Sequence, residues 1–361
     1  MEIIPAKPIP KAPRLYAVEF LRVAFILLII AGHSHGVFSP EDKAAFLNFF
    51  HAKHFSFPIV VEYFFVIGGF FLYKRATSGA PVWSLIKKTY SRLAPGVFFA
   101  FLLCLCWKIA HIYDLPDIVF LNVGLALKEG GDMGLGTWFL CVYFWSSCFL
   151  IALFSQSPKR AFLWLGVVLY AGFCLRGHIK EADGRGLFLA WHGVWGTWFA
   201  RGICSMGLGM LGGFLAEKFQ TMPKKWPLRI LFTLLEAYCL YELYRKVMVW
   251  KPSHFSYLSI QLLLVLLLVS IAGSYGYLSA ALNKARWIWY LSRYTFAALI
   301  GHIIVGPLIL VRYHQYFPVS GAWLLVIVIV VGYAVGMFEY HFVERFLVPK
   351  LQKWLAPPEE T

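Results

Sequence analysis

The chain has 361 residues, of which 60% are hydrophobic and only 14% are charged, and its mean hydropathy is +0.68. So much apolar sequence excludes a soluble globular protein, because a soluble core cannot bury it. The formal net charge of +15 at pH 7 is spread over many short segments and forms no basic motif or soluble domain, which argues against a nucleic-acid-binding protein. The sequence therefore predicts an integral membrane protein.

Ten apolar runs predict membrane-spanning helices, each of which needs about 20 mostly apolar residues. They cover residues 16–38, 56–73, 93–110, 137–154, 161–175, 194–216, 230–249, 255–278, 289–311 and 322–344. The fifth run is short enough to be tilted or re-entrant. The loops between the runs are all short. The predicted fold class is thus an all-α integral membrane protein of about ten helices in one domain.

The distribution of Lys and Arg predicts how these helices are oriented. One set of alternate loops carries roughly twice as many Lys and Arg residues as the other set, and cytoplasmic loops collect positive charge. Both termini are therefore expected in the cytoplasm, with the basic rims facing anionic membrane lipid. The predicted organisation is a cytoplasmic lead at 1–15, a transmembrane domain at 16–346 and a cytoplasmic tail at 347–361.

The first predicted helix, 16–38, carries Glu19 and Arg22 near one end and His33 near the other. At 100° per residue, the eleven-residue step from Arg22 to His33 returns to within about 20° of the same direction and spans roughly 16 Å. Glu19, one turn before Arg22, is placed to pair with it. Ionisable groups in a bilayer usually face a cavity or pathway. Two plainer interpretations stay open: Arg22 snorkels to the cytoplasmic interface, and His33 is a hydrogen-bonded interfacial histidine.

Several segments in chain order resemble the membrane-bound acyltransferase-3 family. They are an arginine, ten residues and then a histidine on the first helix, with an acidic residue before them (Glu19, Arg22, His33), and the segments EYFFVIGGFFLYKR (62–75), KKTYSRLAPG (87–96), GTWFLCVYF (136–144), YLSRYTFAALIGH (290–302) and FVERF (342–346). Gly68 departs from the pattern, because the family more usually has serine there. The resemblance touches most of the chain.

This resemblance implies an acyl-CoA-dependent O-acyltransferase, located in a bacterial inner membrane. The acyl group is commonly acetyl, with succinyl as an alternative, and it passes from cytoplasmic acyl-CoA to a hydroxyl of a cell-surface or lipid-linked carbohydrate. His33 is then the expected general base, because a neutral imidazole can take the proton from the attacking hydroxyl. Arg22 either binds the donor or shapes a channel with Glu19, and we favour donor binding because guanidinium offers several fixed donors.

Further residues are candidates for the two sides of the reaction. On the donor side, Lys87, Lys88 and Arg92 are candidates for the CoA phosphates, although a basic cytoplasmic loop is more often a topology signal.

On the acceptor side, Glu62 is a candidate for orienting His33, and Trp138 is a candidate for stacking on a sugar ring, although packing explains most tryptophans here. Arg201 and His302 are further substrate-binding candidates, because they lie inside predicted spans, where an ionisable side chain needs a partner.

The sequence also favours some chemistries over others. The four histidines nearest the first loop (His33, His35, His51 and His54) match no zinc-site spacing, so no metal is expected. The seven cysteines lie in or at the ends of predicted spans and are expected to pack rather than to form disulfides.

A transporter or flippase is the alternative, with Arg22, His33, Arg201 and His302 lining a pathway, and a non-catalytic scaffold is a third class. We find no inverted repeat to support transport. The acceptor and the oligomeric state are left open.

Overall fold

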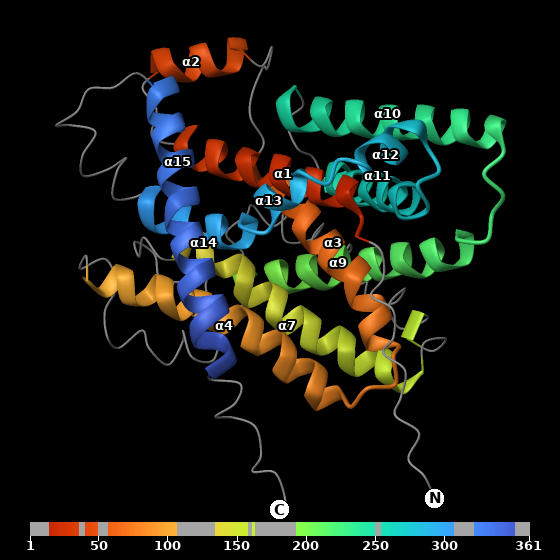
Figure 1. Cartoon of the computed structure of the whole chain (residues 1–361), viewed down its shortest axis with the longest axis horizontal. Helices are drawn as coiled ribbons and strands as arrows, with labels where there is room; N and C mark the ends of the chain where they lie inside the picture. Colours follow the sequence, from red (N-terminus) through yellow and green to blue (C-terminus); the bar gives the residue numbers. More distant parts are fainter. Residues whose placement is uncertain are drawn as a thin grey trace, which may run out of the picture.

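The structure is a computed structural model of the chain, and it describes residues 14–35, 40–49, 57–106, 134–157, 161–162, 193–249, 254–306 and 321–350. Every regular element in these ranges is a helix, which confirms the all-α prediction for this part of the chain (Figure 1). The helices are α1 (Tyr16–His35), α2 (Pro40–Phe49), α3 (Phe57–Ala76), α4 (Val82–Cys106), α7 (Gly134–Gln156), α9 (Gly193–Phe219), α10 (Trp226–Met248), α11 (His254–Gly273), α12 (Tyr277–Leu282), α13 (Ile288–Ser292), α14 (Thr295–Gly306), α15 (Gly321–Glu339) and the π-helix η4 (Tyr340–Leu347).

Most of the predicted spans agree in position with one helix of the structure, with exceptions at 93–110 and 289–311. The run at 161–175 lies outside the described residues except for its first two. Within the described residues, one helix, Leu325–Lys350, is long and apolar enough to cross a membrane by length and composition. Phe139–Ser155 and Leu258–Gly273 are shorter apolar helices. The count of ten spans and the cytoplasmic location of both termini stay predictions.

Helix α4 begins at Val82, well before the predicted span at 93–110. Its first turns are amphipathic, and a search for continuous apolar runs does not find an amphipathic helix. The buried face carries Leu85, Thr89 and Leu93, and the exposed face carries Lys87, Lys88 and Arg92. The basic residues that were expected in a cytoplasmic loop therefore lie on a helix.

Two other predicted boundaries are also wrong. The predicted loop at 39–55 contains the helix α2, whose first residue is Pro40 and whose first turn carries Glu41, a combination that favours a helix start. The predicted span at 289–311 is broken at Arg293 into α13 and α14. Hydropathy alone shows neither feature. A short polar helix such as α2 has the average hydropathy of a loop, and a turn of two residues hardly changes the average of the apolar run around it.

Helices α3 and α9 make the most extensive contact in the bundle, and glycines let their backbones touch. A Cβ atom added at Gly69 of α3 would lie 1.8 Å from the carbonyl oxygen of Met206, and one added at Gly209 of α9 would lie 2.0 Å from the carbonyl oxygen of Val66. Small residues at helix contacts are typical of membrane bundles. This contact fixes how the polar residues of α3 and α9 face one another.

The amino-terminal end of α1 is held by side chains from later helices. Glu236 of α10 accepts a hydrogen bond from the Ser279 backbone N–H at the start of α12, at 3.0 Å, and so satisfies a donor that a helix start leaves unpaired. At the far end of α12, the Asn283 side-chain oxygen accepts the Ala17 N–H of α1 at 2.8 Å. The turn of α1 that carries Glu19 and Arg22 therefore starts from a fixed point.

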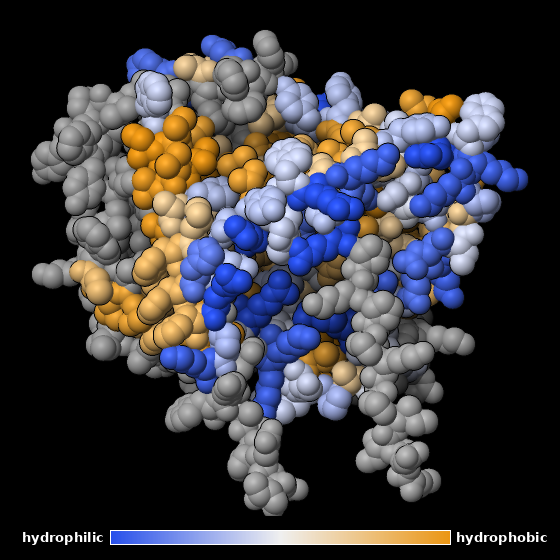
Figure 2. Space-filling view, viewed as in Figure 1, coloured by the Kyte–Doolittle hydropathy of each residue, from blue (hydrophilic) through white to orange (hydrophobic). Residues whose placement is uncertain are grey.

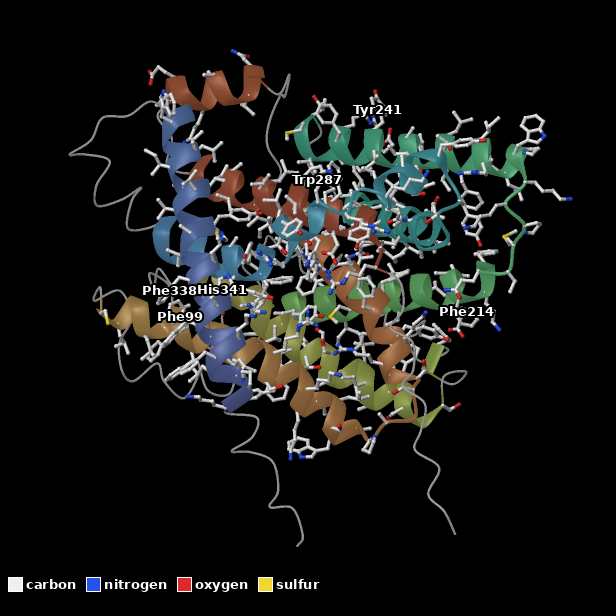
Figure 3. The ribbon with its side chains drawn as sticks, viewed as in Figure 1. Phe99, Phe214, Tyr241, Trp287, Phe338 and His341 are labelled. Carbon is white, nitrogen blue, oxygen red and sulfur yellow. The ribbon has the colours of Figure 1, made fainter. Side chains whose placement is uncertain are left out.

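The outer surface carries large apolar side chains, as a bilayer requires. Figure 2 shows hydrophobic residues gathered over α15 and a diagonal band of hydrophilic residues beside them. Trp323, Val330 and Phe338 of α15 are each more than half exposed. Phe338 also contacts Phe99 of α4, with ring centroids 6.0 Å apart (Figure 3). Apolar patches of this kind mark contact with lipid or with another protein.

Candidate functional site

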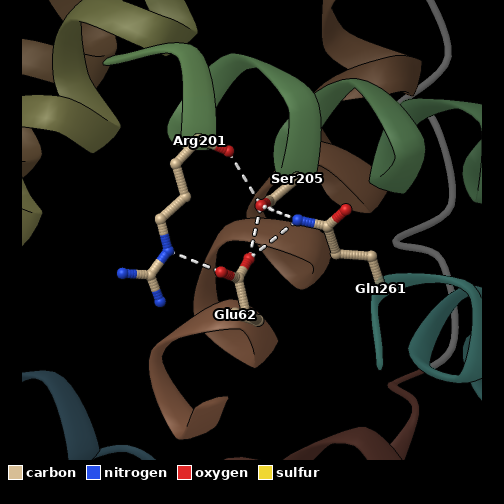
Figure 4. Close-up of polar contacts among 4 residues, drawn as sticks. All are labelled: Glu62, Arg201, Ser205 and Gln261. Atoms are coloured by element: carbon tan, nitrogen blue, oxygen red, sulfur yellow. Dashed lines mark hydrogen bonds and ion pairs between the residues drawn. The ribbon is translucent and has the colours of Figure 1, made fainter. Parts of the chain in front are cut away.

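Four polar side chains from three helices meet inside the apolar bundle. They are Glu62 of α3, Arg201 and Ser205 of α9 and Gln261 of α11, and all four are buried (Figure 4). Two of them, Glu62 and Arg201, were singled out from the sequence. Charged residues are almost never buried unless they are paired, so such a cluster needs a complete set of partners.

The hydrogen bonds occupy both oxygens of the Glu62 carboxylate. Arg201 Nε donates to Glu62 Oε1 at 2.5 Å. Gln261 Nε2 donates to Glu62 Oε2 at 3.1 Å and to Ser205 Oγ at 2.7 Å. The Ser205 hydroxyl has two acceptors in reach, Glu62 Oε2 and the Arg201 carbonyl oxygen one helical turn earlier. Glu62 is thus the acceptor on which α3, α9 and α11 converge.

The local sequence explains why these groups meet. Arg201 and Ser205 are four residues apart, so they lie on the same face of α9, and the glycine contact between α3 and α9 brings this face against Glu62. Gln261 is a single amide within the apolar stretch IQLLLVLLLV at 260–269. A buried ion pair contributes little net stability by itself, but it defines which helix faces can pack together.

A second ionic group lies on α1. Arg22 Nη1 donates to Glu19 Oε2 at 2.8 Å, so the pairing predicted from their spacing is present. The Arg22 side chain is 28% exposed and the Glu19 side chain 14%. Among the described residues, Glu19 is the one ionic partner of Arg22, and their hydrogen bond uses one of the five N–H donors of the guanidinium.

The neighbour of Glu62 connects these two groups. The Tyr63 hydroxyl donates to the Val18 carbonyl oxygen of α1 at 2.9 Å. The Tyr63 ring stacks on Phe25 of α1, with centroids 4.3 Å apart and planes 8° from parallel. Consecutive residues of α3 therefore hold α9 and α11 through Glu62 and hold α1 through Tyr63.

His302 belongs to a different part of the bundle. It is buried in α14, where its Nδ1 lies 3.3 Å from the Ala298 carbonyl oxygen of the same helix. Its Cβ atom packs against Gly332 of α15. These described contacts are within α14 and with α15, so they do not join His302 to the Glu62 cluster. Its expected place in a site stays a prediction.

The other candidates from the sequence are less closely connected to this region. Lys87, Lys88 and Arg92 lie on the exposed face of α4, and the Lys87 ammonium is 5.7 Å from the centroid of the Trp83 ring. His33 lies in the last turn of α1 and Trp138 in the first turns of α7, and both side chains are outside the described part of the structure. The role of His33 as a base therefore stays a prediction.

Sequence reasoning missed Ser205, Gln261 and Tyr63. A signal for the first two existed: a serine four residues after an intramembrane arginine, and one amide in an unbroken apolar run, are polar groups that need partners. Tyr63 gave no signal, because it stands in a run of aromatic residues. Within the described residues, no group of three or more His, Cys, Asp or Glu side chains is placed to hold a metal ion.

Comparison with known proteins identifies one family. A family model described as an acyltransferase domain matches residues 15–338. Neither the curated proteins nor the solved structures that were compared contain a match. The matched range includes α1, the Glu62 cluster and the α14–α15 pair.

Proposed function

The chain belongs to the acyltransferase-3 family, and on this basis we propose that it transfers an acyl group from cytoplasmic acyl-CoA to a hydroxyl of a cell-surface or lipid-linked carbohydrate. Membership makes it a membrane acyltransferase in general. The proposal adds acetyl as the preferred group, a bacterial inner membrane as the location and a carbohydrate as the acceptor. These additions are supported by the segments that resemble the family and by the apolar outer surface.

The observation that carries the proposal is the state of Arg22. It is a partly exposed guanidinium fixed by Glu19 through one nitrogen, on a helix whose first turns are held by Asn283 and Tyr63. A guanidinium presents five N–H donors in a fixed plane, so one held by a neighbouring carboxylate suits a phosphate or a carbonyl oxygen. We assign it to the CoA donor, with Lys87, Lys88 and Arg92 as further phosphate contacts from α4.

The proposed reaction uses His33 at the other end of α1. Its imidazole takes the proton from the acceptor hydroxyl while the hydroxyl oxygen attacks the thioester carbonyl. The new C–O bond forms, the C–S bond breaks, and the CoA thiolate leaves and takes the proton that His33 has accepted.

Glu62, Trp138, Arg201 and His302 complete the proposed acceptor side. Because both Glu62 oxygens are bonded within the bundle, its proposed contribution is to fix Arg201 in place.

The proposal is tested by acetyl-CoA turnover of the purified protein in nanodiscs. Release of free CoA is followed with and without a pool of cell-surface glycans, and succinyl-CoA is tried in parallel. We expect release that depends on the acceptor pool. A folded protein that releases no CoA from either donor with any glycan pool contradicts the proposal and favours a transporter.

Replacing Arg22 with alanine is expected to weaken acyl-CoA binding by about ten-fold to a hundred-fold, which is the size of a lost hydrogen bond to a charged group. The dissociation constant of acetyl-CoA is measured directly. Arg245→Ala is the matched control, because Arg245 pairs with Glu242 at the same spacing and the same 2.8 Å distance on α10. Equal binding by the two variants would show that Arg22 is structural.

A further inference from the structure

Tyr63 is a buried residue that holds the part of α1 around Arg22. Its hydroxyl bonds the Val18 carbonyl oxygen, four residues before Arg22, and its ring stacks on Phe25, three residues after it. Four residues are about one helical turn, so the two contacts lie one turn on either side of Arg22 and on a common side of the helix.

The Val18 carbonyl oxygen also takes part in the backbone hydrogen bonding of α1. In an α-helix this carbonyl accepts the backbone N–H of residue 22, so it belongs to the hydrogen bond that ends at Arg22. A carbonyl oxygen has two lone pairs and can accept the Tyr63 hydroxyl as well. The hydrogen bond from the Tyr63 hydroxyl thus restrains both the rotation and the axial position of the turn of α1 that carries Glu19 and Arg22.

The position of Tyr63 is itself fixed by the residue before it in the chain, Glu62. Its neighbour Glu62 is bonded to Arg201, Ser205 and Gln261, so this turn of α3 is attached to α9 and α11. A rotation of α1 at Arg22 then has to break a bond to a part of α3 that cannot follow it.

We propose that Tyr63 is a positioning residue for the acyl-CoA donor, which it serves by fixing the orientation of Arg22 through the Val18 carbonyl. This inference rests on the proposed function, in which Arg22 binds the donor. It predicts that the Tyr63 hydroxyl contributes to donor affinity without touching the donor and without contributing to the chemical step.

The variant Tyr63→Phe removes the hydroxyl and keeps the ring that stacks on Phe25. We expect the KM for acetyl-CoA to rise about three-fold to ten-fold, the range of one net hydrogen bond, while kcat and the Tm stay close to wild type. Tyr275→Phe is the matched control. Tyr275 is also buried and stacks on Phe232 with centroids 4.8 Å apart, but its hydroxyl has no partner among the described residues. Its removal should leave the KM unchanged.

A double variant separates positioning from general loosening of the bundle. If Tyr63 acts through Arg22, Tyr63→Phe should change donor affinity in the wild-type protein and leave it unchanged in an Arg22→Ala background. Direct measurement of the acetyl-CoA dissociation constant gives this comparison even when turnover is slow. The same proportional loss in both backgrounds overturns the assignment, and so does a fall in kcat with an unchanged KM.

The outcomes also distinguish this inference from the proposed function. Wild-type protein that turns over acetyl-CoA, with a Tyr63→Phe variant indistinguishable from it, refutes the positioning role and leaves the acyltransferase proposal intact. Wild-type protein that neither binds nor turns over acetyl-CoA refutes both.

Discussion

Replacing His33 with alanine is expected to lower the kcat for acyl transfer by about two to four orders of magnitude, the range that general base catalysis contributes. The protein should still fold and bind acyl-CoA, because His33 is in the last turn of α1, far from the proposed donor contact at Arg22. The measurement is CoA release under saturating acetyl-CoA and acceptor, with the donor dissociation constant determined separately.

The matched control for this prediction is His35→Ala. His35 is two residues further along α1, and at 100° per residue it points about 200° away from His33. This variant shows whether removing any histidine near this end of α1 lowers the activity. If both variants lose activity to the same extent, the effect comes from the helix end and not from a base at residue 33. If His33→Ala keeps the wild-type kcat, the base assignment is wrong.

Replacing Glu62 with alanine is expected to destabilise the protein by about 3–5 kcal/mol, as when one partner of a buried ion pair is removed. The Arg201 Nε would lose its acceptor inside the bundle, and Gln261 would lose one of its two bonds. Unfolding of the purified protein in a defined detergent by heat or denaturant measures the change. Unaltered stability would contradict the description of Glu62 as the acceptor that joins three helices.

A double variant shows whether the loss comes from an unpaired charge. Removing both charges together, as in Glu62→Leu with Arg201→Met, should be less destabilising than the sum of the single variants, because no buried charge is left without its partner. Additive losses would mean that the two side chains act independently, against the 2.5 Å contact between them.

The Glu19–Arg22 pair shows what the sequence can predict about a site. Both residues lie on one helix, three positions apart, and helical geometry alone places their side chains in reach of each other. The common helical face of Arg22 and His33 is predicted in the same way and stays a prediction, because the His33 side chain lies outside the described part of the structure. Local relations of this kind depend only on the period of the helix.

The Glu62 cluster shows the limit of that reasoning. Glu62, Arg201 and Gln261 come from three helices, and periodicity gives the face of each helix but not which faces meet. The meeting of α3 with α9 depends on glycines whose missing side chains let the backbones touch, and hydropathy gives them no weight. Helix α4 was predicted too short for a related reason, since its first turns are amphipathic. Family resemblance, and not geometry, suggested a catalytic role for His33.

The chain separation within the Glu62 cluster has a consequence for biosynthesis. The partners of Glu62 come 139 residues later at Arg201 and 199 residues later at Gln261. At about 5–20 residues per second, the ribosome needs about 7–28 s after making Glu62 before Arg201 exists. During this time the Glu62 carboxylate lacks its ion-pair partner Arg201, and Gly69 has no α9 backbone to contact. The contacts of α3 with α9 and α11 therefore form only after these later helices have been made, whereas the contact between α1 and α3 can form earlier.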